Sequence, residues 1–161
     1  MADLGRRGHR ARGTAALTGR RRPDDDPLER VRAICLALPE TSERPSHGAP
    51  TFFIRGKRSF VMYLDDHHGD GRLAIWCAAP LGAQDELVET APERYFVPPY
   101  VGHRGWIGLR LDRDAAWSEV EAVIEDAFLA AAPVRLADAA RAARSLCVPI
   151  TLFTPRARSR S

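Results

Sequence analysis

The chain has 161 residues, a length typical of one domain with short flanking segments, and 45% of them are hydrophobic, enough to build a core. It contains no run of about 18 apolar residues that would span a bilayer. Its arginine-rich start leads into aspartates rather than into the apolar stretch of a secretory signal. Composition therefore excludes a membrane protein and predicts a soluble, cytoplasmic one.

The formal net charge of +3 is unevenly distributed. Residues 1–22 contain seven arginines and one aspartate, and residues 133–161 contain six arginines and one aspartate, which leaves −8 for residues 23–132. Nucleic-acid phosphates attract clustered Lys and Arg. A nucleic-acid role would therefore depend on the tails or on a local basic patch, because the expected core is acidic.

The cysteines are odd in number and far apart. Cys35, Cys77 and Cys147 form no C-x-x-C pair, so neither a disulfide framework nor a zinc site is indicated. We expect reduced, structural thiols.

Residues 1–23 are expected to form a disordered basic tail. They consist largely of Arg, Gly, Ala and Thr, which cannot bury enough apolar surface to offset the entropy of ordering. The tail is either a nucleic-acid-binding arm or an idle solvated segment, and the second is commoner for charge runs.

A first helix is predicted to follow. Asp26 suits an N-cap, Pro27 suits the first helical position, and Glu29 completes the spacing of a capping box. The apolar residues then recur at helical intervals until Pro39 ends the run. They are Leu28, Val31, Cys35 and Leu38.

Three strands are expected after a polar loop. Residues 51–54 and 59–64 are rich in β-formers and flank a glycine-containing turn at 55–58, as in a hairpin. A second turn-rich segment, 65–71, precedes a third strand at 72–77. Together they predict a three-stranded meander.

The second half of the chain predicts two further helices and two further strands. A helix over residues 81–91 is stopped by Pro92, and strands at 95–97 and 106–111 flank a glycine-rich loop. The clearest periodicity belongs to the last helix, which begins between Asp114 and Ser118, where Ser118 and Glu121 have capping-box spacing. Its apolar face comprises Trp117, Val120, Val123, Ile124, Ala127, Phe128 and Ala131, and its acidic residues, Glu119, Glu121, Glu125 and Asp126, are expected mostly in water.

The order α-β-β-β-α-β-β-α predicts an α+β fold with two layers, an antiparallel sheet and helices packed on one of its faces. We place this domain at residues 24–138. Residues 139–161 are expected to form a C-terminal extension, partly helical and then mobile.

Several short motifs occur in the order and spacing of a known family. They are Leu38-Pro39-Glu40, Ser46-His47-Gly48-Ala49-Pro50-Thr51-Phe52, Gly56-Lys57, Pro92-Glu93-Arg94-Tyr95-Phe96, Pro98-Pro99-Tyr100-Val101-Gly102, Gly105-Trp106 and Ala132-Pro133. In these motifs the chain resembles the MmcQ/YjbR family over residues 27–138. The resemblance implies a compact domain similar in topology to type III secretion chaperones, and a DNA-binding protein. Trp76 departs from the family pattern, which often has a polar or basic residue there.

The densest aromatic and basic segment is residues 95–112, around His103 and Arg104. If the sheet brings it beside the 55–58 turn, the cations would engage phosphates while Tyr100 or Trp106 stacks on a base. The predicted nucleic-acid-binding residues are Arg55, Lys57, Arg58, Tyr100, His103, Arg104, Trp106 and Arg110. The alternative is that Tyr100 and Trp106 are core or lid residues, Arg104 pairs with an acidic neighbour and the glycines serve turn geometry.

Other chemistry is less well supported. His67 and His68 lie among aspartates, but adjacent loop residues rarely converge on one metal ion, and turn geometry accounts for them. Gly56-Lys57 lacks the spacing of a phosphate-binding loop, and no nucleophile elbow occurs. We expect no metal, no cofactor and no enzymatic activity.

Three functional hypotheses remain. The first is a small DNA-binding protein. The second is a protein- or peptide-binding module, or a chaperone-like homodimer, without affinity for nucleic acid, and the acidic core favours it. The third is a small-molecule pocket beneath the proline-rich loop.

Overall fold

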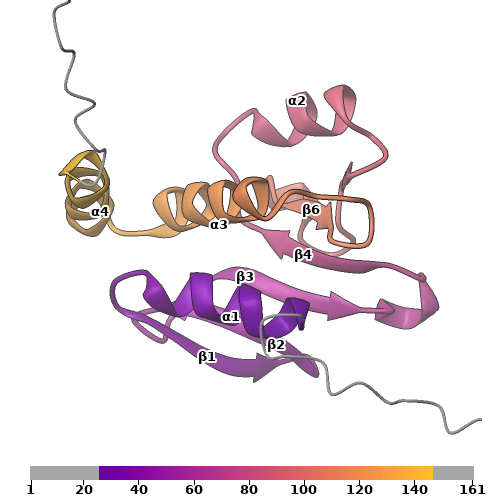
Figure 1. The fold of residues 1–161 in the computed structure, drawn as a ribbon, viewed down its shortest axis with the longest axis horizontal. Coiled ribbons are helices and arrows are strands. Elements are labelled where there is room, and N and C mark those ends of the chain that lie inside the picture. The colour runs from indigo at the N-terminus through magenta and orange to yellow at the C-terminus, as the bar shows by residue number, and fades with distance from the viewer. Residues whose placement is uncertain (1–25, 147–161) are drawn as a thin grey trace, which may run out of the picture.

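The computed structural model describes residues 26–146, which form a six-stranded sheet and four α-helices (Figure 1). The helices are α1 (Pro27–Ala37), α2 (Ala83–Thr90), α3 (Trp117–Ala131) and α4 (Val134–Leu146). The strands are β1 (Thr41–Ser46), β2 (Ala49–Ile54), β3 (Arg58–Asp65), β4 (Leu73–Cys77), β5 (Tyr95–Phe96) and β6 (Ile107–Arg110). Two short 3-10 helices, η2 (His67–Gly69) and η3 (Gly102–Arg104), lie in loops. The predicted N-terminal tail and residues 147–161 lie outside the described part.

The strands follow the order β1-β2-β3-β4-β6-β5, and all neighbouring pairs are antiparallel. The main core lies on one face of this sheet, where α1 and α3 pack against the strands and α4 packs against α3 (Figure 1). The predicted α+β fold, with helices on one face of an antiparallel sheet, is confirmed. None of the helices within residues 26–146 is long and apolar enough to cross a membrane.

The start of α1 follows the sequence pattern. The Asp26 carboxylate accepts a hydrogen bond from the backbone N–H of Leu28 at 3.0 Å, and Pro27 occupies the first turn. Glu29 does not complete the predicted capping box. Its carboxylate pairs with Arg32 one turn along the helix.

A β-bulge between β2 and β3 shapes the main core. Phe52 pairs with Val61, but Phe53 pairs with Ser59, so Phe60 is an extra residue on β3. Because the bulge interrupts the alternation of the strand, both Phe60 and Val61 are fully buried in the main core. The Phe60 ring meets Phe128 of α3 edge to face, with 5.9 Å between ring centroids.

Strand β1 corrects one expectation, since a polar loop was predicted before residue 51. Ser46 pairs with Ala49 across a two-residue turn in which His47 and Gly48 both have positive φ, 52° and 79°. This is the backbone of a type I′ hairpin turn. The strand carries no apolar alternation because it is a polar edge strand that contains Pro45.

The helices after the sheet differ from expectation at their ends. Ala116, which has no capping side chain, precedes α3, so the capping box predicted at Ser118 is wrong. Glu119 is not turned to water: its carboxylate accepts hydrogen bonds from Arg94 at 2.5 Å and from the Tyr95 hydroxyl at 2.7 Å. Helix α4 continues through residue 138, so the predicted domain boundary falls inside a helix.

One ion pair connects α1 to the edge strand. Arg32 donates two hydrogen bonds to the Glu43 carboxylate, at 2.5 and 2.8 Å, and they hold the pKa of Glu43 below its ordinary value. A carboxyl group whose pKa is lower in the folded state stabilises the fold above its unfolded pKa. That stabilisation is lost as the pH falls through the folded pKa.

We therefore expect Glu43→Gln to reduce the free energy of unfolding by about 1 kcal/mol at neutral pH. The two proteins should converge in acid, where Glu43 is protonated in both states. Urea denaturation across a pH series measures this difference. Glu121→Gln, at an exposed residue with no ion pair among residues 26–146, is the matched control. A pH-independent loss in Glu43→Gln would contradict the assignment.

Candidate functional site

The sheet face opposite α1 and α3, which we term the open face, carries a second and smaller cluster. Its buried members are Ala49, Leu64, Trp76 and Trp106, with Met62, Ala78, Phe96 and Val101 packed against them. All eight come from strands or loops. Chain segments other than helices must therefore cover this face.

A row of paired residues crosses the open face through Met62, Trp76, Gly108 and Phe96. The Phe96 ring lies on Gly108, since a Cβ at that position would overlap the ring. The Arg72 guanidinium lies 4.4 Å from the centroid of the same ring. Near the other edge of the sheet, Arg44 lies 4.1 Å from the Phe53 ring. Both arginines cover aromatic surface while their charge stays at the protein surface.

Trp76, the residue that departs from the family pattern, is covered by the β3–β4 turn. Its side chain is only 3% exposed. The His67 ring of η2 meets the Trp76 ring edge to face, with 5.0 Å between ring centroids. The centroid of the His68 ring lies 4.1 Å from that of His67. The turn that sequence analysis considered for a metal is thus packed on the sheet through aromatic contacts.

The loop of residues 97–106 also folds over the open face near Trp76, and hydrogen bonds from α2 hold it in place. The Gln84 side-chain amide donates hydrogen bonds to the carbonyls of Gly102, at 2.8 Å, and Trp106, at 2.5 Å. Gly102 itself is packed so tightly that a Cβ would overlap Val97. Gln84 was not among the predicted site residues, because a lone polar residue on a short helix gives no local signal.

Tyr100 projects from this loop and is the candidate contact residue. It is 72% exposed and has a positive φ of 66°. Its ring centroid lies 6.5 Å from His67 and 6.4 Å from His68. The structure therefore brings the β5–β6 loop to the β3–β4 turn, and the predicted partner of this loop was the β2–β3 turn.

Four of the eight predicted site residues are engaged within the protein. Trp106 is 4% exposed and belongs to the open-face cluster. Arg55 pairs with Glu40, and Arg110 donates hydrogen bonds of 2.7 and 3.0 Å to Asp112. Arg58 donates to the backbone carbonyl of Ala131, at the end of α3, at 3.0 Å. Trp106 thus lies in the core, and Arg55 and Arg110 pair with carboxylates.

The four others are Lys57, Tyr100, His103 and Arg104, all exposed. Within residues 26–146, Lys57, His103 and Arg104 form no ion pair. Lys57 lies apart from Arg110, because the β2–β3 turn is at the end of the sheet marked by the Val61–Cys77 pair. Arg110 pairs with Ala74 near the other end. The eight residues thus do not share one surface, and three of the four accessible ones, Tyr100, His103 and Arg104, lie in the β5–β6 loop.

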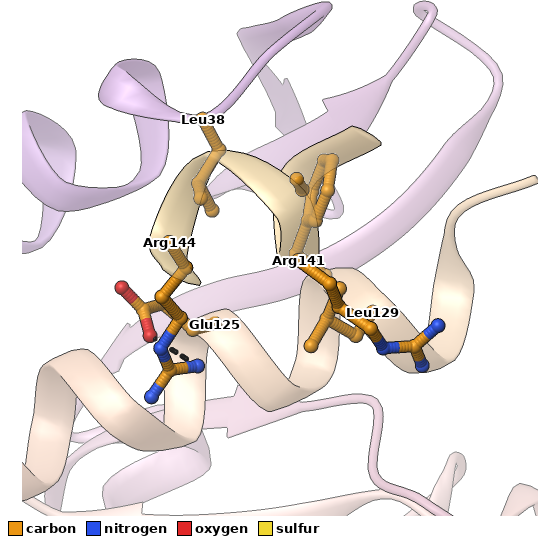
Figure 2. Close-up of a pocket in the computed structure, with 7 residues that line it drawn as sticks. Leu38, Glu125, Leu129, Arg141 and Arg144 are labelled. Carbon is orange, nitrogen blue, oxygen red and sulfur yellow. Dashed lines mark ion pairs between the residues drawn. The ribbon is translucent and has the colours of Figure 1, made fainter. Parts of the chain in front are cut away.

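Two hollows in the described part are small. Figure 2 shows a groove between α1, α3 and α4, where Leu38 and Leu129 lie beside the Glu125–Arg144 ion pair of 2.7 Å. It encloses about 60 Å³, as does a second hollow between α2 and α3. Ligand pockets usually hold roughly 300 Å³ or more. Neither hollow is lined by the loop of residues 97–106, where sequence analysis considered a small-molecule pocket.

A metal site also finds no support in the part of the chain that the structure covers. Among residues 26–146, no group of three His, Cys, Asp or Glu side chains is placed to hold a metal ion. Asp66 and Asp70, in the turn that holds His67 and His68, instead accept hydrogen bonds from the backbone N–H groups of Gly71 and Arg72, at 2.8 and 3.0 Å.

The sequence matches YjbR over residues 36–130, which include the whole open face and its loop. The chain belongs to the YjbR family. The crystal structure of Deinococcus radiodurans protein DR2400, described as a DUF419 domain, is similar to it with a TM-score of 0.52 and 17% identity. The likeness covers 66% of this chain and 75% of that chain, and at this identity it concerns the fold alone. No curated protein matches the sequence.

In this YjbR domain, the contact of the Phe96 ring with Gly108 can be tested by a double-mutant cycle. Gly108→Ala should lower the free energy of unfolding by about 1–3 kcal/mol, because the added methyl group displaces the ring. In a Phe96→Ala background the same change should cost less, since the overlapping ring is gone. Urea denaturation of the four proteins gives the coupling free energy. Additive costs would contradict the contact.

Proposed function

We propose that this YjbR-family protein binds DNA through a loop surface formed by Tyr100, His103 and Arg104. The observation that carries the proposal is the exposure of Tyr100, an aromatic ring that the fixed loop holds away from the core. Exposed aromatics beside cationic groups bind nucleic acid by stacking and by phosphate contact. The family resemblance, which implies DNA binding, points the same way.

The charge distribution indicates how much of the affinity for DNA the described residues and the segments outside them would each supply. Residues 26–146 contain 14 Lys and Arg against 18 Asp and Glu, whereas the segments outside them contain ten arginines and three aspartates. Because phosphate attraction follows local positive charge, we infer that the basic segments supply much of the affinity. The loop surface would supply the specific contacts. We further propose that the protein is cytoplasmic and has no enzymatic activity.

A second candidate, a protein- or peptide-binding module, is favoured by one further observation. Leu81, Val97 and Tyr100 are exposed apolar side chains in the two segments that the Gln84 contact joins. Exposed apolar side chains that lie together mark protein-binding surfaces. Strand pairing is a poor route to such a partner, because β1 is polar and contains Pro45 and β5 has two residues. A partner would therefore contact the loop surface and not extend the sheet.

The proposal predicts that Arg104→Ala weakens DNA binding several-fold at low salt. It should also reduce the salt slope by about 0.7–0.9, as expected for one lost phosphate contact. Fluorescence anisotropy of the full chain with labelled duplex and single-stranded DNA, over a series of salt concentrations, measures both quantities.

Arg55→Ala is the matched control, because Glu40 already engages that guanidinium. Equal losses in Arg55→Ala and Arg104→Ala would indicate a general charge effect and remove the loop surface from the interface. Absence of binding at low salt would overturn DNA binding and leave the peptide-binding candidate.

A further inference from the structure

We propose that the loop surface binds one unpaired nucleobase and that Tyr100, His67 and His68 form its subsite. The inference rests on the proposed function and deepens it. It commits the protein to single-stranded nucleic acid as its preferred ligand and adds two residues of the β3–β4 turn to the interface.

The first argument is the geometry of the three rings. The Tyr100 ring is almost perpendicular to His67, at 86°, and steeply inclined to His68, at 70°. The imidazoles therefore meet Tyr100 edge to face and do not stack on it. Since Tyr100 is 72% exposed, a face of its ring is free to stack on a planar base.

The second argument is that the rings are held in place. His67 rests against the buried Trp76, and its own Nε2 atom is buried there. Gln84 fixes the loop that carries Tyr100. The site is thus assembled before a ligand arrives, which lowers the entropic cost of binding.

The third argument is backbone strain. Asp66, His68 and Tyr100 all have positive φ, at 49°, 55° and 66°. This left-handed conformation is uncommon for a bulky residue such as Tyr100, whereas Asp and His adopt it more often, as they do in turns elsewhere in the described residues. The strain that bears on this site is therefore that of Tyr100. Strain of this kind persists where the surrounding structure enforces it.

The fourth argument is the distribution of charge around Tyr100. The turn that carries the imidazoles also carries Asp65, Asp66 and Asp70, whose carboxylates repel phosphate. Carboxylates accept hydrogen bonds from the amino groups of bases. His103 and Arg104 follow Tyr100 in η3. With carboxylates on the turn and cationic side chains in η3, we expect the base to lie toward the turn and the phosphates toward η3.

A base within a duplex is stacked on its neighbours and cannot lie on a side-chain ring without being extracted. The subsite therefore favours single strands. Alanine substitution of such stacking residues costs affinity equivalent to about 5- to 150-fold per base.

The test measures the affinity of the full chain, at low salt, for a single-stranded oligonucleotide, its duplex and an abasic oligomer of equal length. We expect the intact single strand to bind most tightly. Tyr100→Ala should weaken that binding about 5- to 150-fold and leave binding of the abasic oligomer unchanged. Tyr100→Phe should retain most of the affinity. Tyr100→Asn, which suits a left-handed backbone, should match Tyr100→Ala if the ring is what matters.

The outcomes separate the two proposals. If the abasic oligomer binds as tightly as the intact strand, or Tyr100→Ala weakens both equally, the base subsite is wrong and phosphate binding stands. If Tyr100→Asn keeps the affinity that Tyr100→Ala loses, the loss reflects the backbone and the subsite is again wrong. If none of the three ligands binds, the proposed function fails as well.

Discussion

The contact between Gln84 and the β5–β6 loop is the constraint on which the candidate site depends. One side-chain amide donates to two backbone carbonyls, those of Gly102 and Trp106, and the Gly102 carbonyl also accepts a hydrogen bond from the backbone N–H of Gly105 at 2.9 Å. Helix α2 also packs Leu87 and Val88 against the main core. The contact thereby links the position of an open-face loop to the helix layer. Tyr100 is exposed and yet positioned because the residues after it are held.

The two faces of the sheet are built on different principles. The helix face is a continuous apolar core, in which the bulge places the Phe60 ring against Phe128 of α3. Among residues 26–146, no α-helix contributes to the open-face cluster. This face is covered instead by an aromatic ring that lies on a glycine, by arginines that lie over rings and by two folded loops. Such a face is thin enough to leave side chains accessible, which is why the candidate contacts are found there.

Sequence periodicity predicted the elements whose signal is local. The residues of α3 and the β2–β3 hairpin were identified because apolar spacing reports burial on one face. Strand β1 was missed because an edge strand needs no apolar residues, although His47-Gly48 is a plausible turn signal. The site was only partly predictable. Arg58 binds a carbonyl 73 residues away and Arg55 binds Glu40 across a hairpin, and no local pattern encodes such partners. The meeting of His67 with Tyr100 likewise depends on two loops folding over one sheet.

The most direct test of the account is amide hydrogen exchange of the full chain with and without a saturating single-stranded oligonucleotide. Exchange slows where a ligand covers or rigidifies the backbone. The account predicts slower exchange at residues 66–71 and 100–105. It predicts unchanged exchange at the backbone amides of α1, α3 and α4, which border the groove of Figure 2. Slowing confined to that groove, or an unchanged loop in a complex that demonstrably forms, would contradict it.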